Sequence, residues 1–176
     1  MRAALDLLYK GSGLLAGFFL VAIASLTLLQ IGGRQLGFAA PSFDEFAGYC
    51  MAASSFLGLA WTFRENDHIR MTLVLHLAHG TARRALEIAC LCATAFLVGF
   101  FAWYACDMVL TSFRLNDVSQ GLVAVPLWIP QAGMALGLVL LFIALADDLV
   151  AVIRGRATSY AAAEARKSSS NPSFER

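Results

Sequence analysis

Long uncharged apolar stretches alternate with short polar connections along this chain. Four stretches lack any Asp, Glu, Lys, Arg or His, and they cover residues 11–33, 46–63, 88–106 and 118–146. A helix rises about 1.5 Å per residue, so each stretch is long enough to cross about 30 Å of hydrocarbon. In the last stretch Pro126 and Pro130 suit the start of a helix better than its middle, which moves the predicted span to 127–146. The pattern therefore predicts an all-α membrane protein with four transmembrane helices.

A fifth segment, residues 71–82, contains no Asp, Glu, Lys or Arg but is too short to cross a bilayer. Placed on a helix, the polar residues in and beside it share one face: His68, Thr72, His76, His79 and Arg83. Apolar residues cover the opposite face, as is typical of a helix that lies flat on a membrane surface. We expect a short cytoplasmic interfacial helix at about residues 68–80.

The composition agrees with a membrane protein. Of the 176 residues, 59% are apolar and 14% charged, whereas soluble domains average about 25% charged residues. The net charge of +1 comes without a basic stripe interleaved with aromatic residues, which argues against nucleic-acid binding. The four cysteines all lie inside apolar stretches and are interpreted as small hydrophobic residues: Cys50, Cys90, Cys92 and Cys106.

The basic residues predict the orientation. Leaving aside the distant Arg176, ten lie at the two ends of the chain and between the second and third spans: Arg2, Lys10, Arg64, Arg70, Arg83, Arg84, Arg154, Arg156, Arg166 and Lys167. The other two connections hold Arg34 and Arg114 alone. Since cytoplasmic connections are enriched in Lys and Arg, both termini are predicted to be cytoplasmic. We expect a membrane domain over residues 1–156 and a disordered polar tail over 157–176.

A cleavable signal peptide is an alternative for the first span. Arg2 and Lys10 precede an apolar run, and Ala22-Ile23-Ala24 resembles a cleavage site. The run continues to Ile31, however, which favours a membrane anchor.

The predicted spans offer little chemistry. They hold no Asp, Glu, Lys, Arg or His, whereas ion-coupled transporters usually keep such charged groups or broken helices near the midplane. No nucleophile and base are paired, so we expect no enzyme activity. His76 and His79 have a spacing that permits joint metal ligation, but a solvated polar face explains them better. We therefore expect neither metal nor cofactor.

Small residues recur four positions apart in the spans, and such spacing lets helix backbones approach closely. The pairs are Gly13 with Gly17, Gly48 with Ala52, Ser54 with Gly58, and Gly133 with Gly137. They serve either to hold the four helices together or to dock a partner. Asp44 and Glu45 are likewise open to two interpretations, as charges at the positive end of the second helix or as a contact for another protein.

Short motifs resemble those of the small permease subunit, the DctQ-like family, of tripartite ATP-independent periplasmic (TRAP) transporters. They are Asp44-Glu45 before Tyr49, Ser55-Phe56-Leu57-Gly58, Arg64-Glu65, His68-Ile69-Arg70, and Pro126-Leu127-Trp128-Ile129-Pro130 followed by Gly133. With the four-span layout, the similarity covers nearly the whole chain. Thr72 stands where such proteins commonly carry an acidic residue.

This resemblance implies a three-part assembly. A periplasmic receptor captures an organic anion, a large permease subunit moves it with sodium, and the small subunit supports the large one. The candidate contacts with these partners or with membrane lipids are Asp44, Glu45, Arg64, His68, Arg70, Arg83, Arg84, Trp128, Gly133 and Gly137.

Two rival hypotheses have the same number of helices. A membrane anchor of a redox complex would carry haem between span histidines, and the predicted spans contain none. A self-sufficient small exporter would resemble proteins with a glutamate in the first span, and residues 11–33 contain no acid.

Overall fold

The computed structural model describes residues 2–37, 42–64 and 81–154. The described part contains four long helices: α1 (Arg2–Gln35), α2 (Phe43–Arg64), α4 (Thr81–Leu115) and α5 (Trp128–Ile153). Each is long and apolar enough to cross a membrane, which confirms the predicted fold class. The interfacial helix predicted at 68–80 and the tail predicted at 157–176 lie outside the described residues.

All four helices extend beyond the uncharged stretches, and α1 and α4 do so by the most. At about 1.5 Å per residue, the 34 residues of α1 and the 35 of α4 each measure roughly 50 Å, well beyond the hydrocarbon thickness. Charged residues limit how much of a helix lies in hydrocarbon, but they do not end the helix itself. Bounds drawn from the absence of charge therefore underestimate the helices.

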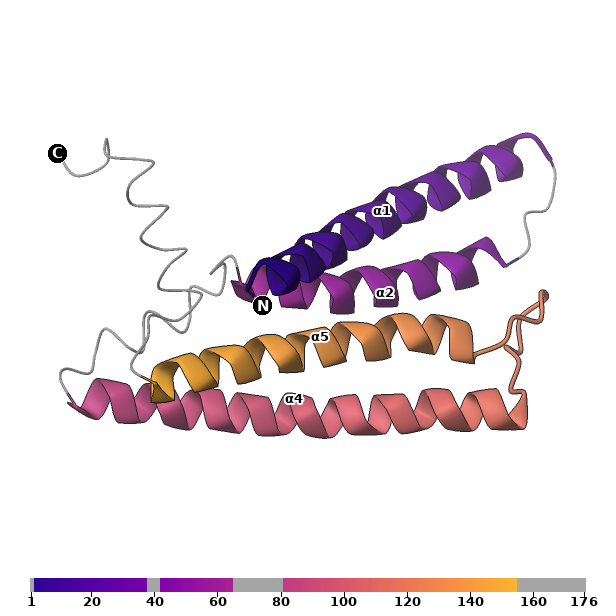
Figure 1. Ribbon diagram of the computed structural model, residues 1–176. Coiled ribbons are helices and arrows are strands. Elements are labelled where there is room, and N and C mark those ends of the chain that lie inside the picture. Colours follow the sequence, from indigo (N-terminus) through magenta and orange to yellow (C-terminus); the bar gives the residue numbers. More distant parts are fainter. Residues whose placement is uncertain (1, 38–41, 65–80, 155–176) are drawn as a thin grey trace, which may run out of the picture.

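The helices form two antiparallel hairpins that lie side by side (Figure 1). One hairpin is α1 with α2 and the other is α4 with α5, and the hairpins meet where α2 packs on α5. The order in space is thus α1, α2, α5, α4. The two central helices have neighbours on both sides, while α1 and α4 lie at the edges.

The end of α1, the start of α2 and the connection between α4 and α5 lie at the same end of the molecule (Figure 1). That connection consists of residues 116–127. We call this end of the molecule the outer end, after the orientation that the basic residues predict. The opposite, inner end contains the start of α1 and the end of α5.

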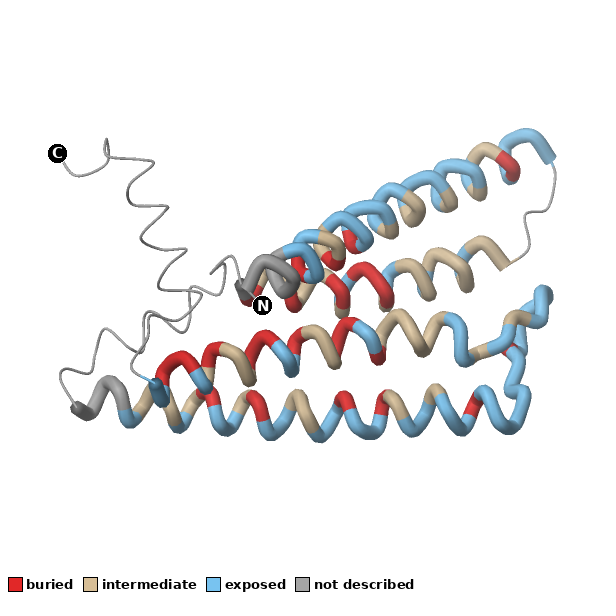
Figure 2. The backbone as a smooth tube through the Cα atoms, in the orientation of Figure 1, coloured by how far each residue is buried: buried red, intermediate tan, exposed pale blue. Residues whose placement is uncertain are grey.

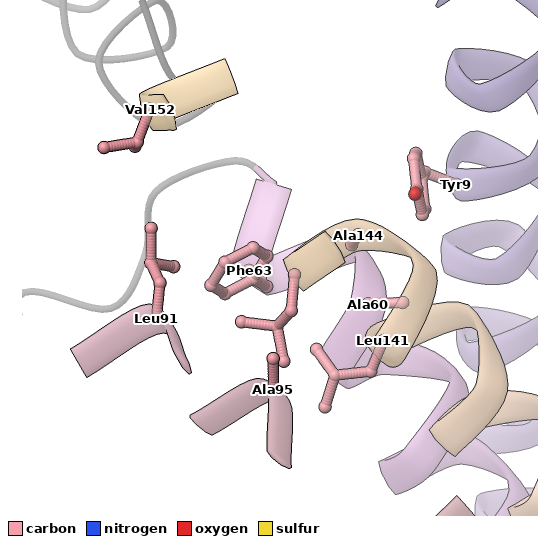
Figure 3. Close-up of a cluster of buried hydrophobic side chains, with 9 residues drawn as sticks. Tyr9, Ala60, Phe63, Leu91, Ala95, Leu141, Ala144 and Val152 are labelled. Atoms are coloured by element: carbon pink, nitrogen blue, oxygen red, sulfur yellow. The ribbon is translucent and has the colours of Figure 1, made fainter. Parts of the chain in front are cut away.

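Buried residues concentrate toward the inner end of the central helices (Figure 2). One cluster there, the inner cluster, has members on all four helices (Figure 3). Its members are Tyr9, Ala60, Phe63, Leu91, Ala95, Leu141, Ala144, Leu145 and Val152. A second cluster joins α4 to α5 nearer the outer end: Ala102, Ala105, Ala135 and Leu138. The many alanines bring the helix backbones close together, as in other membrane bundles.

The edge helices expose large apolar side chains. Examples are Leu14 and Phe18 on α1, and Phe96 and Trp103 on α4. In water such surfaces would drive aggregation, but hydrocarbon accepts them on every face of a helix. The exposed faces are those of a multi-pass membrane protein.

Candidate functional site

The two hairpins pack tightly at two glycines of α5. A Cβ added to Gly133 would lie 3.1 Å from the Cβ of Ala53 on α2. One added to Gly137 would lie 2.7 Å from the Cβ of Phe56 and would also press on the Phe56 backbone. Both glycines therefore pack against α2 within the chain. Their role as contacts for a partner stays a prediction.

The α1–α2 contact also uses small residues. A Cβ on Gly13 would lie 2.9 Å from the indole ring of Trp61, so the missing side chain makes room for this ring. Ser54 donates a hydrogen bond of 3.0 Å from its hydroxyl to the carbonyl oxygen of Ala16. In contrast, Gly17 and Gly48 face open space. These two remain available as small-residue surfaces for a partner helix.

An apolar groove runs between α1 and α5, over α2. It has a volume of about 330 Å³ and is lined almost wholly by leucines: Leu7, Leu8, Gly11, Ser12, Leu15, Leu57, Leu136 and Leu140. Such a surface suits an acyl chain or an apolar helix.

The two acids predicted as candidate contacts begin α2 at the outer end, where a carboxylate favours the positive end of the helix dipole. Asp44 is exposed. Glu45 is half-buried and accepts a hydrogen bond of 2.5 Å from the hydroxyl of Tyr49, one turn further along the helix. The Ser119 side chain faces the same carboxylate from the loop of residues 116–127. The two neighbouring acids therefore differ, since Glu45 has partners within the chain and Asp44 faces outward.

Ser119 belongs to the loop of residues 116–127, which folds back on itself. The Ser119 amide donates to the Val125 carbonyl at 2.8 Å, and the Leu127 amide donates to the Asp117 carbonyl at 2.9 Å. The Ser119 hydroxyl lies 3.1 Å from the Val123 carbonyl and accepts from the Val125 amide at 3.3 Å. These backbone hydrogen bonds give the loop a defined shape.

Two contacts join this loop to the start of α2, and we call the residues gathered there the outer latch: Ser42, Glu45, Tyr49, Ser119 and Gly121. The Val123 amide donates to the Ser42 hydroxyl at 3.2 Å. Any side chain on Gly121 would collide with the Glu45 carboxylate, which the Ser119 side chain also faces. Ser42 has a φ of 68°, in the left-handed region that a serine rarely adopts.

Trp128 begins α5, directly after this loop. Its ring meets that of Phe113 edge to face, with centroids 5.7 Å apart, and part of the ring stays exposed. This is a suitable arrangement for an aromatic residue at the boundary between hydrocarbon and water.

The basic candidate contacts that fall in described helices lie at the inner end. Arg64 ends α2, and Arg83 and Arg84 lie in the first turn of α4. His68 and Arg70 lie outside the described residues.

One buried acid was missed. Asp148 is 1% exposed and lies on the face of α5 that contributes Leu145 and Val152 to the inner cluster. The predicted fourth span ends at residue 146, so Asp148 was expected to lie outside that span. A signal was available, because Asp148 keeps helical spacing with the apolar residues on both sides.

No metal or redox centre is visible in the described part of the chain. The four cysteines are free thiols, and no three His, Cys, Asp or Glu side chains of the described residues gather closely enough to hold an ion.

The geometry is thus that of a helical membrane subunit with close-packed interfaces and a structured outer loop. A comparison with curated proteins finds no match to the chain. The sequence profile of the family described as "Tripartite ATP-independent periplasmic transporters, DctQ component" matches residues 23–155, well over half of the chain. The chain therefore belongs to the DctQ family and is a small membrane subunit of a TRAP transporter.

Proposed function

We propose that this chain supports a large permease subunit, which imports an organic anion together with sodium after a periplasmic receptor delivers the anion. Membership in a family that is one component of a tripartite transporter supports this role. So does the absence of Asp, Glu, Lys, Arg and His from the middle of each described helix.

The observation that carries the proposal is the uncharged, unbroken middle of each helix. Residues 11–33, 46–63, 88–106 and 128–146 are helical throughout and contain no Asp, Glu, Lys, Arg or His. A sodium ion or carboxylate stripped of water needs polar groups or free backbone groups near the midplane. Uninterrupted helices satisfy their own backbone groups and provide neither.

The buried Asp148 does not alter this argument. It lies 20 residues after Trp128 in α5, which is about 30 Å along the helix axis. If Trp128 marks the outer boundary of the hydrocarbon, Asp148 lies near the inner boundary, far from the midplane.

The edge helices are the surfaces that we assign to the large subunit and to lipids. On α1, Gly17 faces open space beside the exposed Phe18, a combination that admits a partner helix at close range. At the inner end we expect Arg64, Arg83 and Arg84 to lie near lipid phosphates or acids of the large subunit. Each would contribute about 1 kcal/mol to lipid attraction.

The proposed location is the bacterial inner membrane, with both termini in the cytoplasm. In a variant with all four native cysteines replaced by alanine, Gln120→Cys should react with an impermeant maleimide added to intact spheroplasts. Arg154→Cys should react only after the membrane is opened. Both native side chains are exposed, so access depends on the side of the membrane. The reverse pattern would contradict the orientation.

Reconstitution tests the supporting role. Liposomes with an inward sodium gradient should accumulate the anion only when this chain, the large subunit and the loaded receptor are all present. Uptake of radiolabelled anion is the measurement, and liposomes without a gradient are the control. Sodium-driven uptake by this chain alone would overturn the proposal, as would full uptake in its absence.

A further inference from the structure

We infer that Glu45 is a positioning residue: through the outer latch it fixes the outer ends of the two hairpins relative to each other and holds the 116–127 loop in one place. The importance of this loop for transport rests on the proposed function, whereas the geometry of the latch is independent of that function.

The latch adds a contact between the hairpins at their outer end. The inner cluster joins all four helices at the inner end, and α2 packs closely on α5 at Gly133 and Gly137. Glu45 precedes Ala53, the α2 partner of Gly133, by about two helical turns, so the latch lies further out along α2 than that contact.

The chemistry of the latch centres on the Glu45 carboxylate, which can only accept hydrogen bonds. Tyr49 donates from the same helix and orients the carboxylate. The Ser119 hydroxyl faces the carboxylate from the other hairpin but donates its one proton to the Val123 carbonyl within the loop. The direct contact between Glu45 and the loop is therefore the close packing at Gly121.

The contact between the loop and Glu45 requires a glycine at position 121. The Glu45 carboxylate occupies the space that a side chain at this position would need. The backbone of Gly121 has no left-handed φ, so the requirement is for space rather than for conformational freedom. Even an alanine must displace either the carboxylate or the loop.

A fixed loop matters for docking. Its residue Leu122 is 84% exposed, and Asp44 is exposed beside the latch residue Glu45. If the loop is already ordered, a protein that docks on the outer end does not have to supply the free energy of ordering it. We therefore expect the latch to affect how tightly the loaded receptor engages, and not how fast the large subunit turns over.

The geometric test is a distance measurement across the outer end. Spin labels at Leu36→Cys and Leu122→Cys, on a cysteine-free background, report on one hairpin each. Both native side chains are exposed. In the complete transporter, pulsed electron paramagnetic resonance should give one narrow distance distribution. Glu45→Ala and Gly121→Ala should each broaden it.

Two variants serve as matched controls. Gly48→Ala changes a glycine of α2 that faces open space, and Asp44→Asn neutralises the neighbouring exposed acid. Both should leave the distribution narrow. Unchanged distributions in Glu45→Ala and Gly121→Ala would overturn the latch.

The functional test uses the reconstituted transporter. Gly121→Ala should raise the concentration of loaded receptor that gives half-maximal uptake roughly tenfold, with the maximal rate unchanged. A loss of maximal rate together with loss of the large subunit on purification would show a merely structural role. If uptake persists without this chain, the proposed function fails. The spin-label distances would still show whether the latch holds the two hairpins in place.

Discussion

Replacing Gly137 with leucine is expected to force the two hairpins apart and to lower the free energy of unfolding by about 3 kcal/mol. Even a Cβ at this position would lie 2.7 Å from the Cβ of Phe56 and would press on its backbone. Backbone cannot move aside as the end of a flexible side chain can. Unfolding in mixed detergent micelles, followed by circular dichroism, measures the loss.

Two variants calibrate this result. Gly17→Leu adds the same side chain where nothing lies within 4 Å and should change the stability of the isolated chain little. Gly133→Ala brings a Cβ to 3.1 Å from the Cβ of Ala53 and should give a smaller loss than Gly137→Leu. If Gly17→Leu and Gly137→Leu lower the free energy of unfolding equally, close packing at Gly137 is not what joins the hairpins.

Replacing Leu145 with alanine should cost about 2 kcal/mol. Leu145 is completely buried in the inner cluster, so truncation leaves a cavity where the four helices meet. Lipid is as apolar as leucine, so the loss is one of packing contacts and not of transfer from water. For this reason we place the value at the low end of the range seen in soluble cores.

Leu136→Ala is the matched control for this variant. Leu136 lies on the same helix and is 59% exposed, so its truncation should change the unfolding free energy by less than about 0.5 kcal/mol. The same detergent titration compares both variants. Equal losses would mean that the inner cluster does not hold the bundle together.

The sequence was sufficient to predict the four helices because the requirement is simple. A membrane span needs length and an absence of charge, and both can be counted along the chain. The helix ends were less predictable. Asp147 and Asp148 ended the predicted fourth span, yet α5 continues to Ile153, since a helix can carry acids near the membrane boundary.

Contacts between distant residues were the harder part. Glu45 was selected from its position before an apolar run, but its neighbours Ser119 and Gly121 lie more than 70 positions away in a segment without a distinctive pattern. Likewise, the spacing of Gly133 and Gly137 predicted a close helix contact without showing its partner. Such pairings follow from how the hairpins lie together, which periodicity within one helix cannot reveal.

The side-by-side order of the helices has a consequence for how the chain comes apart. In a closed bundle every helix packs against two others, so the stability of each helix depends on two neighbours. In a row, each edge helix packs mainly against one neighbour, so its stability depends on that one contact. Each hairpin, held by its own internal contacts, is then a natural unit of membrane insertion, and the α2–α5 seam forms when the two units meet. Damage at the seam should release two inserted hairpins before either one unfolds.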